Sequence, residues 1–304
     1  MGEADKNIVV GVDVGGTKIS VGTISFSGEV LGQPVMVPTG AEDEKEKIID
    51  RITGAIESVI RNSGFPESHI LGIGLGVTGP LDINTGTILE CPQLPSLNFC
   101  PLKEKIQNHF GLPVFMDNDA NSLVLGESLW GAGSSYRIVL GYTLGTGLGC
   151  ALVIDRKLFT GANGMAGEIW PSPYGAGTIE DVVSGNGISV LYERFTHKRK
   201  TAKEISLMAG QGDADARKAW EEFGKTLAVA LAWGINLIDP DIVVLGGSIV
   251  NSLELFSNVM EETILNYICP VPAKKTRIVP VMLGDNAGFI GAAGLVVQGN
   301  NKNS

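Results

Sequence analysis

The sequence predicts an α/β fold made of two duplicated halves. Residues 8–30 read as strand, glycine turn, strand, Ser-Gly turn and strand, and residues 137–159 repeat that order. A repeated supersecondary unit indicates an internal duplication. Apolar runs typical of buried strands also alternate with segments whose apolar residues recur at helical spacing, which is the pattern of an α/β protein.

The predicted elements of the first half follow one another without a linker. The β-branched run Ile8–Val14 is broken by two glycines and resumes at Ile19. Residues 70–77 are a buried-looking strand, and residues 112–116 are a strand that leads into a polar turn and a helix from about Ser122. Between the first two strand regions, helical spacing relates Ile48, Ile49, Ile52, Ile56, Val59 and Ile60.

The second half ends in a strand and a small-residue helix. Residues 241–250 read as a buried strand with a Gly-Gly turn, and residues 287–298 as a glycine- and alanine-rich helix, which we expect to pack back onto the first half. The expected domains are residues 1–121 and residues 122–304, the second being the larger. Before that strand, an amphipathic helix is traced by Trp220, Phe223, Leu227, Leu231 and Ile238.

Composition excludes several classes of protein. With 33 acidic and 23 basic residues in 304, the net charge of -10 disfavours nucleic acid or an anionic membrane as a partner. It leaves a phosphorylated ligand open, because backbone N–H groups and a metal ion can hold phosphates. No apolar run is long enough to span a bilayer, and the polar N-terminus does not resemble a secretory signal. The four scattered cysteines predict reduced thiols in a cytoplasmic protein.

The first glycine turn is a candidate phosphate loop. Gly15 and Gly16 allow close approach of a ligand to the backbone, and Thr17 and Lys18 follow them. Asp13, at the end of a strand, could hold Mg²⁺ directly or through water. From this motif alone, a plain hairpin turn with an exposed acid is an equally good interpretation.

Two further glycine turns extend this hypothesis. Gly145, Thr146 and Gly147 occupy the equivalent place in the second half, so that a nucleotide would be held from both sides. Neither a Walker loop nor a dinucleotide fingerprint fits this turn. Gly246 and Gly247 could let an adenine or ribose lie against the backbone, and an ordinary strand-to-helix turn is the alternative.

An acid-amide turn supplies the candidate catalytic group. Phosphoryl transfer to a hydroxyl needs a carboxylate that accepts the proton and a neighbouring amide that fixes the acceptor, and Asp119 and Asn118 offer both. A helix N-cap with spare acids is the alternative. Glu168 and Glu180 lie in a long glycine-rich stretch and could bind sugar hydroxyls, or could be solvated loop acids.

The order of these motifs resembles the ROK family of sugar kinases, within the actin, hexokinase and heat-shock ATPase superfold. The resemblance runs from Ile8 to about Val297. The matching pieces are DVGGTK, GVTGPLD, the LP at Leu94-Pro95, DNDAN, LGTGLG, LFTGANGMAGE, IDPDIVVLGG and GDNAGFIGAA. It implies two duplicated actin-like (ribonuclease H-like) α/β domains that flank a nucleotide and sugar cleft.

The resemblance also implies an activity and roles for single residues. It indicates ATP-dependent phosphorylation of a hexose or hexose derivative, most simply at the 6-hydroxyl as in a glucokinase. Asp119 would be the general base, and the sugar would bind at Gly79, Asn118, Glu168 and Glu180. Asp13 and the glycine loops would hold ATP with Mg²⁺.

One departure from the family concerns zinc. Many ROK members carry a histidine and a cysteine-rich knuckle that bind structural zinc, and here Trp170 stands at the histidine position while residues 174–180 contain no cysteine. The sequence therefore predicts no zinc site. We expect a hydrophobic plug instead, made of Trp170, Pro171, Pro173 and Tyr174, with ordinary core as the alternative for Trp170. The missing histidine leaves the sugar open among glucose, mannose, fructose, an N-acetylhexosamine and a rarer sugar.

Two rival functions are disfavoured. Sugar-responsive repressors of the same family carry an N-terminal helix-turn-helix domain, for which the 12 residues before Asp13 leave no room, and the chain is acidic. A non-catalytic sugar-binding relic would not need Asp13, Asn118 and Asp119. The expected partners are therefore a sugar and ATP, without nucleic acid or membrane, and a homodimer is possible because dimers are common in the family.

Overall fold

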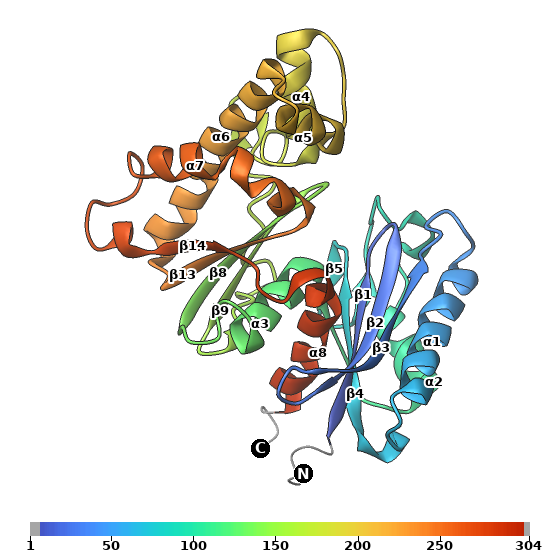
Figure 1. The fold of residues 1–304 in the computed structure, drawn as a ribbon. Helices are drawn as coiled ribbons and strands as arrows, with labels where there is room; N and C mark the ends of the chain where they lie inside the picture. The colour runs from blue at the N-terminus through green and yellow to red at the C-terminus, as the bar shows by residue number, and fades with distance from the viewer. Residues whose placement is uncertain (1–6, 301–304) are drawn as a thin grey trace. The chain divides into compact units, whose positions relative to one another are not determined.

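The computed structural model describes residues 7–300 and divides the chain into two compact units, which are described separately (Figure 1). Unit 1 holds the chain up to Ser135, then Val153–Gly164, then the chain from Val281 on; unit 2 holds Tyr136–Leu152 and Met165–Pro280. Residues 1–6 lie outside the described residues. They are part of the polar N-terminus that does not resemble a secretory signal.

Unit 1 is built on a five-stranded sheet of order β3-β2-β1-β4-β7. The first three strands pair antiparallel, and β1, β4 and β7 pair parallel. The strands are β1 (Ile8–Val14), β2 (Lys18–Ser25), β3 (Val30–Pro38), β4 (Ile70–Val77) and β7 (Val114–Asn118). Small β5 (Leu81–Asp82) and β6 (Thr87–Ile88) form a separate hairpin.

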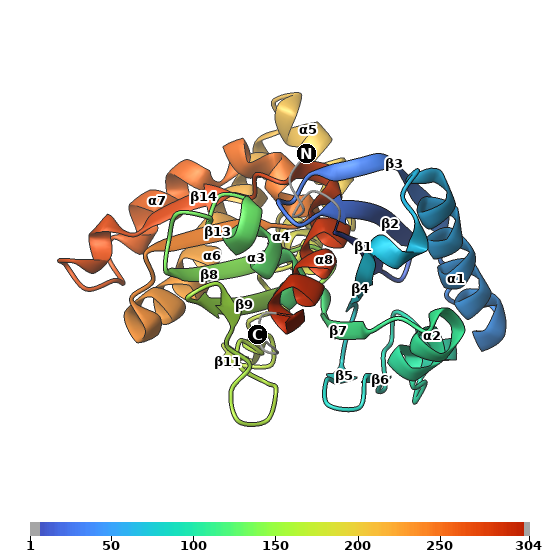
Figure 2. The same ribbon diagram turned by 90° about the horizontal axis from the view of Figure 1, so that it is seen from below.

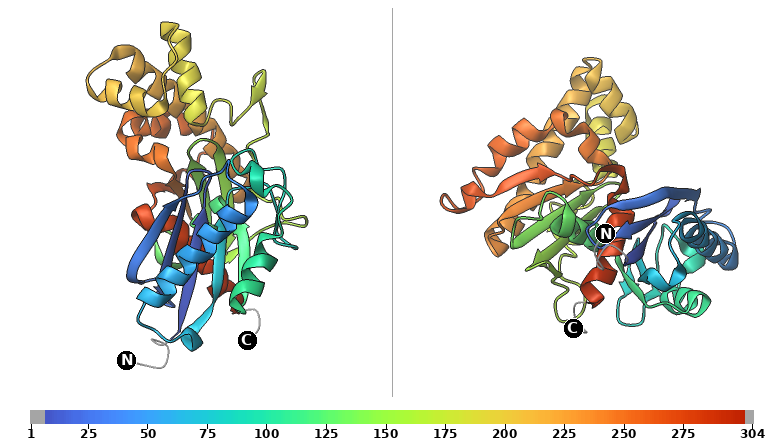
Figure 3. Two further views of the ribbon diagram at one scale, coloured as in Figure 1. Left: turned by 90° about the vertical axis from the view of Figure 1, so that its right-hand side faces the viewer. Right: turned by 60° about the horizontal axis from the view of Figure 1, so that its bottom comes forward.

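Helices cover both faces of this sheet, which explains why β1 is apolar on both sides. Val10 and Val12 share a buried cluster with Ile48 and Ile52 of α1, whereas Val9 shares one with residues of α8. Figure 3 shows α1, in blue, and α8, in red, on opposite sides of the strands. The helices of unit 1 are α1 (Lys45–Asn62), α2 (Leu102–Phe110), α3 (Asp119–Trp130) and α8 (Ala287–Asn300).

The C-terminal helix α8 lies directly on the strand backbones of unit 1. A Cβ placed on Gly11 of β1 would lie 1.8 Å from the carbonyl oxygen of Phe289, and one on Gly74 of β4 would lie 1.8 Å from that of Ala292. Glycine is therefore required at both strand positions, because only its missing side chain lets helix and sheet approach so closely.

The second sheet, on which unit 2 is built, repeats the strand order of the first. It runs β10-β9-β8-β13-β14, with β10 antiparallel to β9, and with β8, β13 and β14 parallel; β10 and the last two residues of β9 fall in the Val153–Gly164 segment of unit 1. Each strand has a counterpart at the same place in the first sheet, and the duplication predicted from the sequence is confirmed. The strands are β8 (Ile138–Leu144), β9 (Leu148–Ile154), β10 (Lys157–Leu158), β13 (Ile242–Gly246) and β14 (Arg277–Pro280).

The long helix α6 (Ala214–Ile238) packs on this second sheet (Figure 2). The hydroxyl of Tyr142 in β8 donates to the carbonyl of Ala230 at 3.0 Å. Four of the five residues predicted to form its apolar face are fully buried, namely Trp220, Phe223, Leu227 and Leu231. The other elements of unit 2 are α4 (Gly185–Thr196), α5 (Ala202–Gly210), α7 (Ser257–Ile264), β11 (Pro173–Tyr174), β12 (Gly177–Thr178) and the 3-10 helix η4 (Ser248–Leu255).

One predicted boundary is wrong. The helix expected from about Ser122 begins at Asp119, because Asn118 caps it three residues earlier than the apolar pattern suggests. The expected domain boundary between residues 121 and 122 falls inside α3, which lies wholly in unit 1. The boundary between residues 121 and 122 stays a prediction about the duplicated halves, because a duplication can divide the chain at a different place from its compact units.

Two further expectations concern membrane and thiols. Within residues 7–300, none of the helices combines the length and apolarity that crossing a bilayer requires. The four cysteines carry free thiols; Cys91, Cys100 and Cys150 are buried, and Cys269 is exposed.

Candidate active site

The acid-amide motif lies where β7 ends and α3 begins. Asn118 is the N-cap of α3, and its Oδ1 accepts the N–H of Ala120 at 2.7 Å. Asp119 is the first residue of the helix, and its Oδ1 accepts the same N–H at 2.8 Å. The helix-cap interpretation is therefore right for Asn118, and the cap also holds both side chains at the end of the strand.

Two residues that the sequence left without a role brace this junction. The buried Asp117 accepts the N–H of Asn118 at 2.7 Å and the side-chain amide of Asn121 at 2.7 Å, both through Oδ1. Burial raises the pKa of Asp117, and these two hydrogen bonds oppose that rise. Asp117 lies in β7, before the helix begins, so helical spacing in the sequence does not predict this contact.

Parallel pairing brings Asp13 to the same edge of the sheet. Val14 of β1 pairs with Val77 of β4, which pairs with Asn118 of β7, so the three strands end side by side. Because ligands of open α/β sheets bind outside the carboxyl ends of the strands, this edge is the place for a site in unit 1. Gly79 follows β4 there, and a Cβ on it would lie 3.1 Å from Nδ2 of Asn118.

The negative charge of Asp119 acts on Asp13. Burial, and then the negative charge of Asp119, raise the pKa of Asp13 to about 7, against a smaller lowering effect of Lys18. Burial also raises the pKa of Asp119, which the Ala120 N–H partly offsets. Two partly buried carboxylates so close together favour a proton or a cation between or beside them.

The first glycine loop is fixed on one side and open on another. The N–H of Gly15 donates to the carbonyl of Lys18 at 3.0 Å, and the hydroxyl of Thr39 donates to the carbonyl of Gly15 at 2.6 Å. Gly16 lies against Gln93, whose carbonyl oxygen would be 2.9 Å from an added Cβ. Thr17 and Lys18 are exposed.

The second glycine loop, in unit 2, also joins two strands through three residues, but it closes with a different hydrogen bond. The N–H of Gly145 donates to the carbonyl of Gly147 at 3.0 Å, and Thr146 at the tip is exposed. A Cβ on Gly145 would meet nothing within 4 Å, so this side of the loop is open to a ligand. Two hydrogen bonds hold the loop: the N–H of Leu148 donates to Glu180, and the N–H of Gly185 donates to the carbonyl of Gly145.

At the third glycine pair, the structure explains why glycine is present. Gly247 has a φ of 87°, and a Cβ on it would lie 2.3 Å from the carbonyl oxygen of Leu144. Gly246 ends β13 and is buried. This pair forms a strand-to-helix turn ahead of η4, and the backbone alone demands glycine at position 247. A contact with the nucleotide stays a prediction.

Glu168 and Trp170 form a hydrogen-bonded pair. The indole N–H of Trp170 donates to Oε2 of Glu168 at 2.7 Å. Trp170 is 43% exposed, so it is not ordinary core. The expected hydrophobic plug is also wrong, because Pro171 and Pro173 are exposed and only Tyr174 packs partly, with its ring 6.3 Å from that of Trp233.

Hydrogen bonds order the glycine-rich segment 165–183, which we call the strap. β11 and β12 pair as a hairpin, and the N–H of Ile179 donates to the carbonyl of Ser172 at 2.9 Å. One carboxylate oxygen of Asp181 accepts the N–H and the hydroxyl of Thr178, at 2.8 and 2.9 Å. Within residues 7–300, no three His, Cys, Asp or Glu side chains are grouped so as to hold a metal ion.

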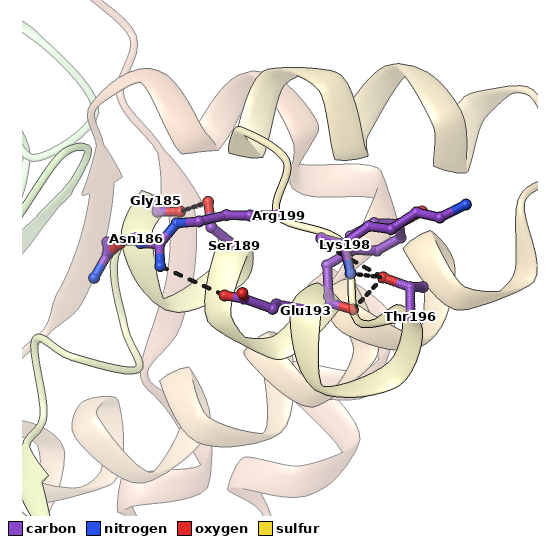
Figure 4. Close-up of polar contacts among 8 residues, drawn as sticks. Gly185, Asn186, Ser189, Glu193, Thr196, Lys198 and Arg199 are labelled. Carbon is purple, nitrogen blue, oxygen red and sulfur yellow. Dashed lines mark hydrogen bonds and ion pairs between the residues drawn. The ribbon is translucent and has the colours of Figure 1, made fainter.

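The first turn of α4 is a feature that the sequence analysis missed. Ser184 caps the helix by accepting the N–H of Gly187, and the next residue, Gly185, is the one bonded to the second glycine loop. Arg199 donates to the side chain of Asn186 at 2.7 Å and forms an ion pair with Glu193 (Figure 4). The Ser-Gly-Asn-Gly run is a helix-start signal that could have predicted this cap.

The structure thus groups the predicted residues within each unit. Unit 1 brings together Asp13, the first glycine loop, Gly79, Asn118 and Asp119. Unit 2 brings together the second glycine loop and Glu180, with Gly247 against Leu144 and with Glu168 held by Trp170.

Comparison with known proteins gives three relatives of nearly equal similarity. A glucokinase of Thermotoga maritima is 32% identical over 95% of this chain and 97% of its own. An N-acetyl-D-glucosamine kinase of Escherichia coli is 31% identical over 93% and 97%. A xylose repressor of Caldicellulosiruptor bescii is 29% identical over 97% of this chain and 79% of its own.

Solved structures and a family model agree with these relatives. A ROK hexokinase from Thermus thermophilus superposes with a TM-score of 0.85 at 28% identity, covering 98% of this chain and all of that one. A ROK family glucokinase from Streptomyces griseus, in complex with glucose and AMPPNP, gives 0.79 at 28% identity, over 95% and 99% of the two chains. The model of the ROK family matches residues 9–299.

Proposed function

Because the chain belongs to the ROK family and is an ATP-dependent sugar kinase, we propose that it phosphorylates the 6-hydroxyl of a hexose, with Asp119 as general base. The observation that carries this proposal is the position of Asp119. It stands on the first turn of a capped helix, at the edge where β1, β4 and β7 end, next to a second carboxylate.

The chemistry asks little of Asp119 beyond proton acceptance. The hydroxyl oxygen attacks the γ-phosphorus, the bond from that phosphorus to the bridging oxygen of ADP breaks, and the hydroxyl proton passes to the carboxylate. A raised pKa brings a carboxylate nearer to neutral pH and makes it a better base than an ordinary Asp. Asn118, fixed by its capping bond, would hold the sugar beside it.

The residues present fit Mg²⁺. Asp13 supplies the oxygen donor that this ion prefers, and its raised pKa marks a place where positive charge is favoured. A single carboxylate suffices, because Mg²⁺ in kinases keeps waters and takes other ligands from the phosphates. When bound, the ion would neutralise the phosphate charge, while the N–H groups of both glycine loops would donate to phosphate oxygens.

The sugar itself is proposed from the relatives. Glucose is our first candidate, with mannose, fructose and N-acetylhexosamines as alternatives, because relatives named glucokinase and N-acetylglucosamine kinase are about equally similar. We propose that Glu168, oriented by Trp170, binds sugar hydroxyls. A regulator is disfavoured although one relative is a repressor, since Asp13 and Asp119 would be needless in it.

A coupled assay of ADP release tests the proposal. Glucose, mannose, fructose, N-acetylglucosamine and xylose would each be offered with MgATP, and the phosphorylated position read by NMR of the product. We expect one hexose to be preferred and its 6-phosphate to form. A sugar that binds in calorimetry without any ADP release would identify a binding protein instead.

The proposed enzyme also has an expected cellular location, set of partners and oligomeric state. The free thiols and the ATP donor suit a cytoplasmic enzyme, with no nucleic acid or membrane as partner. A homodimer, common in the family, is testable by sedimentation.

A further inference from the structure

Glu180 lies behind the second glycine loop and holds its backbone. Its Oε2 accepts the N–H of Leu148 at 2.8 Å, across 32 residues of sequence. Leu148 is the first residue of β9 and follows the loop directly. This carboxylate therefore fixes the point at which the loop returns to the sheet.

Gly147 makes this contact possible. A Cβ there would lie 2.5 Å from the same Oε2 atom, which is closer than real contacts allow. Because its φ is not in the left-handed region, the backbone of residue 147 does not itself require glycine. The atoms nearest to such a side chain are those of the Glu180 carboxylate, which would have to shift away from its present position.

A second tie comes from the same stretch of chain. Five residues after Glu180, the N–H of Gly185 donates to the carbonyl of Gly145 at 2.8 Å. The loop is thus held at both ends by residues 180–185, and the Glu180 N–H in turn donates to the carbonyl of Trp170 at 3.4 Å. The strap that carries Glu168 and the loop proposed to hold phosphates are parts of one hydrogen-bonded assembly.

We propose that Glu180 is a positioning residue for the nucleotide: its carboxylate holds the 145–148 loop in the form whose N–H groups receive the phosphates. This inference rests on the proposed kinase function and adds a second role to the sugar-binding role expected for Glu180. Preorganised donors stabilise transition-state charge without the cost of reorganisation, so a loosened loop weakens both nucleotide binding and transfer.

The test compares two substitutions of Glu180. Glu180→Ala removes the acceptor, and we expect the KM for ATP to rise about tenfold with a fall in kcat, because the loop is no longer held in place. Glu180→Gln keeps an acceptor oxygen, and we expect nucleotide parameters close to wild type. A residue that only binds sugar would behave differently: both variants would raise the sugar KM and leave that of ATP unchanged, which would overturn the positioning role.

A double-mutant cycle identifies the partner. Gly147→Ala should weaken ATP binding in the wild type, because its Cβ displaces Oε2, and should cost much less in the Glu180→Ala background, where that contact is gone. Equal costs in both backgrounds would overturn the proposal. Asp181→Ala is the matched control, because this neighbouring carboxylate contacts Thr178 and not the loop, and it should leave the KM for ATP unchanged.

Calorimetry separates this proposal from the kinase assignment. If the wild type phosphorylates no sugar, the proposed function fails, yet the affinity for MgADP still reports on the loop. Loss of MgADP affinity in Glu180→Ala, with Glu180→Gln unaffected and melting temperatures similar, supports the positioning role. Unchanged MgADP affinity in Glu180→Ala overturns it, and if that variant does not fold, Gly147→Ala and Glu180→Gln decide the matter.

Discussion

The carboxylate of Asp119 lies close enough to that of Asp13 for its negative charge to raise the pKa of Asp13. The two residues are 106 positions apart in the sequence, and they lie at the ends of two strands in the parallel part of one mixed sheet. Two carboxylates held near each other repel while both are charged, so a cation bound beside them is favoured. This suits an enzyme that must bind a metal nucleotide and take up a proton.

Asp119→Asn should nearly abolish turnover. The amide keeps the shape of the side chain and can still accept the Ala120 N–H, but it cannot take the hydroxyl proton. We expect kcat to fall by about two to four orders of magnitude with sugar affinity retained, as measured by steady-state kinetics and calorimetry. Activity within tenfold of wild type would remove Asp119 as the base.

Asp13→Asn should stabilise the metal-free protein while abolishing transfer. A carboxyl group whose pKa is higher in the folded than in the unfolded protein lowers the free energy of unfolding as the pH rises. For Asp13 this occurs between its unfolded pKa of about 4 and its folded pKa of about 7. In chelator, the wild-type melting temperature should therefore decline over that interval more than that of Asp13→Asn. Parallel pH profiles would show that Asp13 is an ordinary carboxyl.

Gly288→Ala should disturb the nucleotide site from the back. Its Cβ would lie 2.4 Å from Oδ2 of Asp13, so the carboxylate or α8 must shift, and we expect the KM for MgATP to rise severalfold. Gly54→Ala is the control, because this exposed helical glycine has nothing within 4 Å of an added Cβ. It should raise stability by about 0.5–1 kcal/mol with kinetics unchanged.

Trp170→Phe should weaken sugar binding selectively. It keeps an aromatic ring but removes the N–H that orients Glu168, so we expect the KM for sugar to rise roughly tenfold with that for ATP unchanged. Trp233→Phe, at a tryptophan that is 39% exposed in the same unit, should change neither constant. An unaltered sugar KM in Trp170→Phe would limit this hydrogen bond to a structural role.

The strap should be independent of zinc. It is closed by the β11–β12 hairpin and by the Asp181 contacts with Thr178, so elemental analysis of the purified protein should find no stoichiometric zinc. Chelator should leave the melting temperature unchanged in the absence of nucleotide. One tightly bound zinc ion per chain, or a melting temperature lowered by chelator, would contradict this.

Much of the fold could be predicted because its signals are local. The β-branched run Ile8–Val14 and the spacing from Ile48 to Ile60 are each contained in one element, and β1 and α1 follow them. The apolar pattern predicts the start of α3 three residues too late, because it does not register Asn118 as the residue that caps the helix.

The parts that could not be predicted depend on contacts between distant segments. No pattern within the strap predicts that Glu180 accepts the N–H of Leu148, 32 residues earlier. Likewise the sequence predicts a hydrophobic plug around Trp170, whereas Pro171 and Pro173 are exposed and the indole N–H donates to Glu168. Register and tertiary hydrogen bonding decide such questions, and one sequence contains neither explicitly.

The composition of unit 1 from three separated segments has a consequence for synthesis. Its sheet is complete once β7 has been translated, but the face that carries Val9 stays uncovered until α8, the last described helix of the chain, has left the ribosome. The nascent chain must therefore expose an apolar surface during translation of about half its length, when chaperones and premature association compete for it. Ribosome-bound chains truncated before residue 281 should accordingly be far more protease-sensitive in unit 1 than the released protein.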